Sequence, residues 1–328
     1  MKQSAFESHY APVWTQLQAL LEELEKGKTP PATQLQQFPS LFRKVCHFHA
    51  LAQERHYSSF LVDYLGDLVV RAHQQMYRRK TPIASALMDF IVRDFPALIR
   101  AERLFVLLAC ALFVVPGLLL FAGGLAAPEL VYTVIEPQQA HQMESMYDPA
   151  NRTIGSARDS DTNWAMFGFY IQNNISVSFR TFASGLVFGI GSAFFLIFNG
   201  ALIGAVAAHL TSVGFYVTFS TFVIGHGSFE LTAIVLSGAA GLKLGHALLA
   251  PGQFTRTQAL KNAAAIAIRM IYGVIIMLLI AAFIEAFWSS NNSFPAVTKY
   301  AVGGCLWFLV ICYFLFSGRS KTEAAIAL

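Results

Sequence analysis

The stretch VIGHGSFELTAIVLSGAAGLKLG, residues 223–245, decides how this chain is interpreted, because it holds three ionisable side chains in otherwise apolar surroundings. These side chains are His226, Glu230 and Lys243. Inside a bilayer, each such group costs about 3 kcal/mol or more unless it is paired or faces protein or water. The interpretation therefore depends on where the chain meets a membrane.

The composition indicates a membrane protein rather than a soluble one. Of the 328 residues, 55% are hydrophobic and 13% are charged, and the mean hydropathy is +0.51, whereas an average soluble domain has about 25% charged residues. The N-terminus has no basic region followed by an apolar one, so it predicts neither a signal peptide nor an anchor, and we expect the chain to begin in the cytoplasm. The four cysteines are scattered, which argues against a disulfide framework. We expect the lipid bilayer as a partner, and no nucleic acid.

The apolar runs predict two domains. Residues 1–101 have apolar residues at three- and four-residue spacing and predict a helical cytoplasmic domain. Its last part contains IASALMDFIVRDFPALIR and predicts an amphipathic helix on the membrane surface. Residues 102–328 predict a transmembrane bundle that includes an extracytoplasmic segment at about 125–178. The expected fold class is all-α: a polytopic membrane helical bundle with a broken or re-entrant hairpin, preceded by a helical cytoplasmic domain.

Basic residues set the predicted orientation, because cytoplasmic loops near membrane spans are rich in Lys and Arg. Three basic clusters flank the apolar runs, whereas the 126–178 segment is net acidic. We therefore expect both termini and the 251–268 loop in the cytoplasm. This placement requires an even number of crossings, so we interpret the chain after residue 213 as a hairpin with its tip at His226. The first arm, about 213–225, is short for a full crossing and predicts a broken or re-entrant segment.

The hairpin brings several polar side chains to a similar depth. His226 and Glu230 are four residues apart and share a helix face, and Glu285 ends a later apolar run on the same side of the membrane. We predict that these three groups converge in a buried cluster, with Asn173 or Asn174 close by. The full set of candidate functional residues is His226, Glu230, Glu285, Asn173, Asn174 and Asn199. The last of these lies deep in its own predicted helix, where we expect a partner helix to satisfy it.

Three roles are open for this cluster. Buried polar residues often fix helix register without doing chemistry, and Glu230 and Glu285 are also candidates for a proton- or ion-coupled pathway. A metal site needs three or four ligands, so it requires His226 and both carboxylates to converge. The sequence has no HExxH motif and no pair of nucleophile and base at useful spacing. We expect no cofactor and no bound metal.

Glycines recur in the apolar runs. Two of them flank His226 and permit the predicted turn. Six others form three pairs at four-residue spacing, which place small residues on one helix face and allow close backbone approach: Gly185 and Gly189, Gly200 and Gly204, and Gly241 and Gly245. Such faces fit the hairpin, a homo-oligomer, or both. The glycines expected to shape the hairpin and the helix contacts are Gly225, Gly227, Gly200, Gly204, Gly241 and Gly245.

Three stretches resemble the stage II sporulation protein M family, also called the DUF95 integral membrane proteins. They are FYIQNNISVSFRTFASGLVFGIGSAFFLIFNGALIGAV, IGHGSFELTAIVLSGAAGLKLG and AAFIEAF. The resemblance covers most of the chain from about residue 95 onward. It implies a bacterial membrane scaffold that recruits peptidoglycan-degrading partners. The large N-terminal domain is similar to the branch found in bacteria that do not sporulate, and that branch implies cytoplasmic ATPase-type partners.

The expected function is therefore that of a non-enzymatic scaffold or assembly factor linked to envelope or peptidoglycan remodelling. It is expected in the bacterial inner membrane, with several passes and both termini in the cytoplasm. Two alternatives remain. One is a transporter or lipid-handling protein that uses the intramembrane His/Glu cluster, and the other is an intramembrane metal-dependent enzyme.

Overall fold

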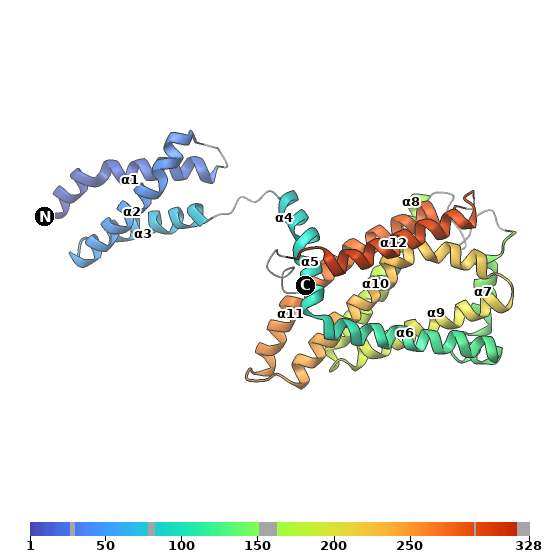
Figure 1. Ribbon diagram of the computed structural model, residues 1–328. Coiled ribbons are helices and arrows are strands. Elements are labelled where there is room, and N and C mark those ends of the chain that lie inside the picture. Colours follow the sequence, from blue (N-terminus) through green and yellow to red (C-terminus); the bar gives the residue numbers. More distant parts are fainter. Residues whose placement is uncertain (27–29, 78–82, 151–162, 292, 320–328) are drawn as a thin grey trace. The chain divides into compact units, whose positions relative to one another are not determined.

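The computed structural model describes residues 1–26, 30–77, 83–150, 163–291 and 293–319. These residues are almost entirely helical, which confirms the all-α fold class. The chain divides into two compact units, Met1–Ile83 and Ala84–Leu328 (Figure 1). Part of the predicted extracytoplasmic segment, residues 151–162, lies outside the described residues.

The first unit is a bundle of three helices with a core of its own. The helices are α1 (Gln3–Glu25), α2 (Ala32–Glu54) and α3 (Ser59–Tyr77). Phe6, Leu17 and Leu65 are buried between them, as the three- and four-residue spacing of apolar positions predicts. An ion pair of 2.9 Å between Arg71 and Glu25 ties α3 to α1.

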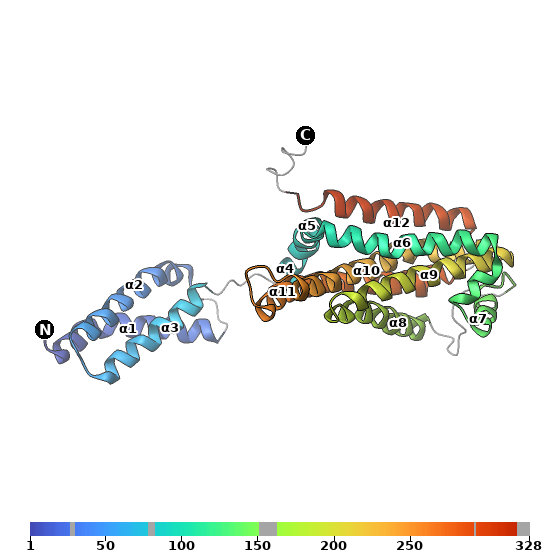
Figure 2. The same ribbon diagram turned by 90° about the horizontal axis from the view of Figure 1, so that it is seen from below.

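The second unit begins with a short helical segment and continues into a bundle of long helices (Figures 1 and 2). The leading elements are α4 (Ile83–Asp89), the π-helical turn η1 (Phe90–Asp94) and α5 (Phe95–Ala101). The remaining elements are α6 (Arg103–Ala126), η2 (Pro128–Thr133), α7 (Pro137–Tyr147), α8 (Asn163–Ala183), η3 (Ser184–Leu186), α9 (Ile190–Ser212), α10 (Tyr216–Leu249), α11 (Arg256–Ile284), η4 (Glu285–Ser289) and α12 (Ala296–Phe316).

The segment 84–101 belongs to the second unit, whereas the sequence-based division placed it with the first. Phe95 and Ile99 are buried in the core of the second unit. Arg100 Nη1 donates to the carbonyl oxygens of Phe314 and Ser317, at 2.9 and 2.7 Å. A cation at this position satisfies the last carbonyl groups of α12. This contact anchors the segment to the end of the bundle.

Within the described residues, five helices are long and apolar enough to cross a membrane, namely α6, α9, α10, α11 with η4, and α12. The chain is therefore a multi-pass membrane protein, as its family likeness and its composition indicate. We refer to the two ends of the bundle as the α5 side, where α6 begins, and the α7 side, where α6 ends. Lys243, near the end of α10, pairs with Glu102 on the α5 side. His209, near the end of α9, pairs with Glu144 of α7.

These two ion pairs fix the directions of the helices. Both α6 and α9 run from the α5 side to the α7 side, and α10 runs back. The chain must therefore return once between α6 and α9, and α8 makes that return. At 21 residues, α8 is about 31 Å long, which is comparable to a hydrocarbon core of roughly 30 Å. It packs against α9, α10 and α11 (Figure 2).

The predicted hairpin at His226 is wrong. The helix α10 is continuous from Tyr216 to Leu249, through Gly225 and Gly227. An unbroken helix satisfies every backbone group within itself, whereas a turn at this depth would leave carbonyl and amide groups without water. The basic residues require an even number of passages across the membrane, and α8, rather than a hairpin, supplies the additional passage. The chain turns before α9 at Gly189 and between α9 and α10 at Gly214, whose φ values of 80° and 87° are suited to glycine.

Four of the predicted packing glycines lie at backbone contacts between elements. Gly200 and Gly204 of α9 lie directly against the backbone carbonyls of Phe113 and Gly117 in α6. In α10, Gly245 lies against the backbone of Phe188 and Gly189, and Gly241 lies against Ser192 Oγ and the Phe182 carbonyl oxygen. A Cβ at any of these positions would overlap atoms of the neighbouring segment, so these glycines permit the close approach of α9 to α6 and of α10 to η3.

We expect Gly200→Ala to lower the free energy of unfolding by roughly 1–3 kcal/mol, because the new methyl group overlaps a rigid backbone carbonyl. Gly304→Ala is the matched control, since a Cβ at Gly304 in α12 has open space around it. Alanine should there be neutral, or stabilising by up to about 1 kcal/mol. Unfolding in mixed micelles measures both effects. Equal effects of the two substitutions would contradict the close α6–α9 contact.

Single cysteines at three exposed positions test the path of the chain. Leu186 and Phe254 lie in connections at the α5 side, and Val213 lies at the α7 side. In a protein without its four native cysteines, an impermeant thiol reagent should label the first two from one side of the membrane and the third from the other. A hairpin at His226 would instead place Leu186 and Phe254 on opposite sides.

Candidate functional site

His226, Glu230 and Glu285 converge inside the bundle. One imidazole nitrogen and one carboxylate oxygen from each glutamate lie within 4.8 Å of one another. His226 and Glu230 lie one helical turn apart on the same face of α10, with 3.7 Å between His226 Nε2 and Glu230 Oε2. The other carboxylate comes from η4. Helix spacing on α10 and the end of α11 thus place all three side chains, although the hairpin used to predict their convergence does not exist.

A π-helical turn positions Glu285. Residues Glu285–Ser289 continue α11 with the wider π geometry, which occurs mostly as single turns and often at functional sites. Ser289, the last residue of this turn, lies with its Oγ 3.0 Å from His226 Nδ1. The turn therefore directs both Glu285 and Ser289 at the same face of α10.

The cluster lies about 15 Å along α10 from its first residue, Tyr216. The sequence-based interpretation placed His226 at the tip of a hairpin, near the membrane surface. The continuous helix places it deeper. His226 and Glu285 are only 4% and 8% exposed, so protein atoms surround the cluster.

The predicted asparagines have different places. Asn174 is buried in α8 and faces Glu285, and it accepts a hydrogen bond of 3.2 Å from Asn173 Nδ2. Its own Nδ2 and Glu285 Oε2 are both buried without a hydrogen-bond partner. Asn173 itself is exposed. We expected a partner helix to satisfy Asn199, but its Nδ2 donates to Phe195 O at 2.7 Å within α9.

Sequence reasoning missed three polar neighbours of this site. Ser289 contacts His226, and the buried Lys299 Nζ donates to the Ser289 carbonyl oxygen at 2.8 Å. Tyr147, the last residue of α7, packs on Phe222, whose ring contacts His226. Burial raises the pKa of the Tyr147 phenol, and the nearby Glu285 carboxylate adds to this effect. No pattern in the polar 125–178 segment predicted that Tyr147 at the end of α7 would pack against α10.

A second ionic contact fixes α7 at its end of the bundle. Glu144 lies 3.2 Å from His141 Nδ1 and 2.8 Å from His209 Nε2 of α9. The hydrogen bond from His141 holds the pKa of the Glu144 carboxyl below its usual value, and the bond from His209 acts in the same direction. At the opposite side, Lys243 forms two contacts of 2.8 Å with the Glu102 carboxylate, so this lysine is paired.

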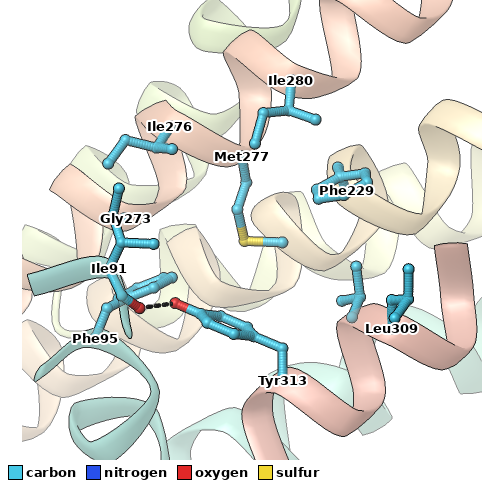
Figure 3. Close-up of a pocket in the computed structure, with 10 residues that line it drawn as sticks. Ile91, Phe95, Phe229, Gly273, Ile276, Met277, Ile280, Leu309 and Tyr313 are labelled. Atoms are coloured by element: carbon cyan, nitrogen blue, oxygen red, sulfur yellow. Dashed lines mark hydrogen bonds between the residues drawn. The ribbon is translucent and has the colours of Figure 1, made fainter. Parts of the chain in front are cut away.

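The bundle also contains an apolar cavity of about 230 Å³, separate from the polar residues (Figure 3). It is lined by residues of α10, α11 and α12 together with Phe95 of α5. Met277 lies on α11 and Tyr313 on α12, and both line the cavity. Tyr313 donates its hydroxyl to Ile91 O at 2.5 Å. The lining of this cavity is suited to apolar groups and not to ions.

The three clustered groups can bind a proton or a divalent cation, because they combine an imidazole nitrogen with two carboxylates in a buried place. Two carboxylates this close and this poorly hydrated repel each other unless a positive charge compensates them. Chemistry at the site therefore depends on what neutralises Glu230 and Glu285.

We expect Glu230→Gln and Glu285→Gln to have non-additive effects on the free energy of unfolding in chelator-treated protein. Neutralising one carboxyl removes the repulsion that the second substitution would relieve, so the interaction energy should be about 0.5–3 kcal/mol. The control pair combines Glu230→Gln with Glu102→Gln, at the α5 side. That pair should be additive within about 0.5 kcal/mol. Additive effects in both pairs would show that the carboxylates act independently.

Comparison with known proteins identifies the family of the second unit. The model of the stage II sporulation protein M family matches residues 104–290, more than half of the chain, and a domain of unknown function (DUF8413) matches residues 4–78 in the first unit. An uncharacterized protein of Methanocaldococcus jannaschii is 30% identical over 79 residues, which are 24% of this chain and 44% of that relative. The chain thus aligns with less than half the length of this curated relative. No solved structure matches. Because the family match includes α8, α10 and η4 with all three members of the cluster, the chain belongs to the stage II sporulation protein M family.

Proposed function

We propose that this protein is a non-enzymatic scaffold or assembly factor that links cytoplasmic partners to remodelling of the bacterial envelope. The observation that carries the proposal lies in α8. Gln172 and Asn173 are exposed near the middle of this helix, which lies beside the apolar spans. Amide side chains that face hydrocarbon are costly, and membrane helices satisfy them across contacts with other helices. A helix of a partner protein at this face would supply those contacts.

The first unit offers a second binding element. Phe60 is 81% exposed, although Phe6, Trp14 and Phe48 of the same unit are buried. Exposed aromatic residues are common anchors of protein interfaces. The basic clusters of the sequence favour a cytoplasmic location for this unit. A soluble partner bound there and a membrane partner bound at α8 would be joined by one chain, which is what a scaffold requires.

The buried state of the cluster supports this function over transport. A transport pathway needs polar groups that reach water from both sides, whereas His226 and Glu285 are enclosed by protein. The cavity described above has an apolar lining. Neither feature favours the passage of an ion or a polar substrate.

Photo-crosslinking in cells tests the scaffold role. A photoreactive residue at Gln172 should form an adduct with another membrane protein of the envelope-remodelling machinery. The same residue at Phe308, which is exposed on α12, is the control for a lipid-facing position. The double substitution Gln172→Leu and Asn173→Leu should reduce co-purification of that partner at least about tenfold, equivalent to about 1.4 kcal/mol. The fold should persist, because neither side chain is buried.

Two outcomes would contradict the proposal. An adduct only with a second copy of the chain would assign the α8 face to a homo-oligomer. A substrate or ion flux through proteoliposomes that contain only this protein, and that Glu230→Gln abolishes, would favour the transporter.

A further inference from the structure

We propose that His226, Glu230 and Glu285 bind a single divalent metal ion of the zinc class. One ligand atom from each residue lies within 4.8 Å of the other two. Two ligands at about 2.1 Å from a tetrahedral zinc ion are about 3.4 Å apart, so the most distant pair of ligand atoms needs to approach by about 1.4 Å at most to close on an ion. The site goes beyond the scaffold role and does not depend on it.

The contact with Ser289 orients the imidazole for this purpose. Ser289 Oγ lies 3.0 Å from His226 Nδ1. In the tautomer with Nδ1 protonated, Nδ1–H donates to Ser289 Oγ and the lone pair of Nε2 is left for a metal. Metal-bound histidines usually have such a partner on their second nitrogen, which fixes the tautomer and the ring orientation. At 3.7 Å, Nε2 is too far from Glu230 Oε2 for a hydrogen bond. Nε2 and this carboxylate oxygen thus face each other across the space that an ion would fill.

An unpartnered ligand atom points to the same place. Glu285 is 8% exposed, and its Oε2 is buried without a hydrogen-bond partner. A buried carboxylate oxygen without a partner is costly, and a metal ion would satisfy it. Asn174 Nδ2 is also buried without a hydrogen-bond partner, and Asn174 faces Glu285 from α8.

Charge balance favours a dication. The two carboxylates carry two negative charges, and His226 contributes none when it is a neutral ligand. The buried Lys299 directs its Nζ to the Ser289 carbonyl oxygen at 2.8 Å. A divalent ion would make the group of three neutral, which lowers the cost of burying it among apolar helices.

The ligand types select the class of ion. Zinc binds imidazole nitrogen and carboxylate oxygen together, whereas calcium and magnesium prefer oxygen ligands alone. Three protein ligands leave a fourth position for water or for another group. The structure thus assigns to this family member a buried metal centre held by α10 and η4.

Zinc binding by the full-length protein tests the assignment. The protein is purified in detergent, stripped with a chelator and titrated with zinc chloride, while the thermal unfolding midpoint and the bound metal per chain are measured. We expect the midpoint to rise until one zinc ion is bound per chain. Glu285→Gln should abolish this rise. Its metal-free form should unfold at the same temperature as the metal-free wild type or higher, because the substitution removes a buried charge.

The control is Glu144→Gln, which removes the carboxylate of a different His–Glu contact, in α7. This variant should retain the full response to zinc. A response that is lost in Glu144→Gln and kept in Glu285→Gln would overturn the assignment, and so would a wild type whose midpoint does not change with zinc.

Two further variants keep the test independent of folding. Ser289→Ala retains all three ligands but removes the partner of His226 Nδ1, and it should weaken zinc binding roughly 10–100-fold. His226→Gln should abolish the visible absorption that cobalt(II) acquires when it replaces zinc in the wild type. Unchanged zinc affinity in Ser289→Ala together with unchanged cobalt absorption in His226→Gln would show that the ion binds elsewhere.

Discussion

The structure depends on the requirement that a helix inside hydrocarbon satisfy its own backbone hydrogen bonds. α10 meets this requirement over 34 residues without interruption. In its most apolar stretch of 18 residues, 67% of the residues are buried, compared with 11% for α6 and 17% for α12. It is the central helix of the second unit, and α6, α8, α9, α11 and α12 all pack against it. Since α10 cannot bend at Gly225 or Gly227 without exposing polar backbone, the neighbouring elements adapt to it.

Close contacts and buried polar groups follow from this central helix. Gly241 and Gly245 let the segment from Gly185 to Gly189 approach the α10 backbone directly. On the opposite half of α10, His226 and Glu230 meet the π-helical turn that carries Glu285. A regular α-helical end to α11 would direct these side chains differently, so the π-turn is part of the polar site.

Function in this protein follows from where polar groups lie relative to lipid. His226 and Glu285 are buried and Glu230 is half-buried, and this favours a bound cation or a structural role over a path for solutes. Gln172 and Asn173 lie on the opposite kind of surface, exposed on α8, and this favours a partner helix. The helix α8 thus has two faces. Asn174 faces the buried site, whereas Gln172 and Asn173 face the exterior of the bundle.

The sequence alone determined the all-α membrane class, the family likeness and the three members of the polar cluster. It did so because hydropathy reports burial in lipid directly, and because residues four apart on a helix share a face. It could not identify α8 as the returning helix. The buried stripe of α8 includes Asn174, Ser178 and Thr181, so its average hydropathy is low even though it lies among the spans. That stripe is stable only because α10 and α11 cover it, and this contact exists only in the tertiary structure. The same holds for Ser289, Lys299 and Tyr147, which reach the cluster through a π-turn and a folded-back helix that no local pattern predicts. Tertiary packing therefore decided the path of the chain and the surroundings of the site, whereas the sequence determined which residues occupy it.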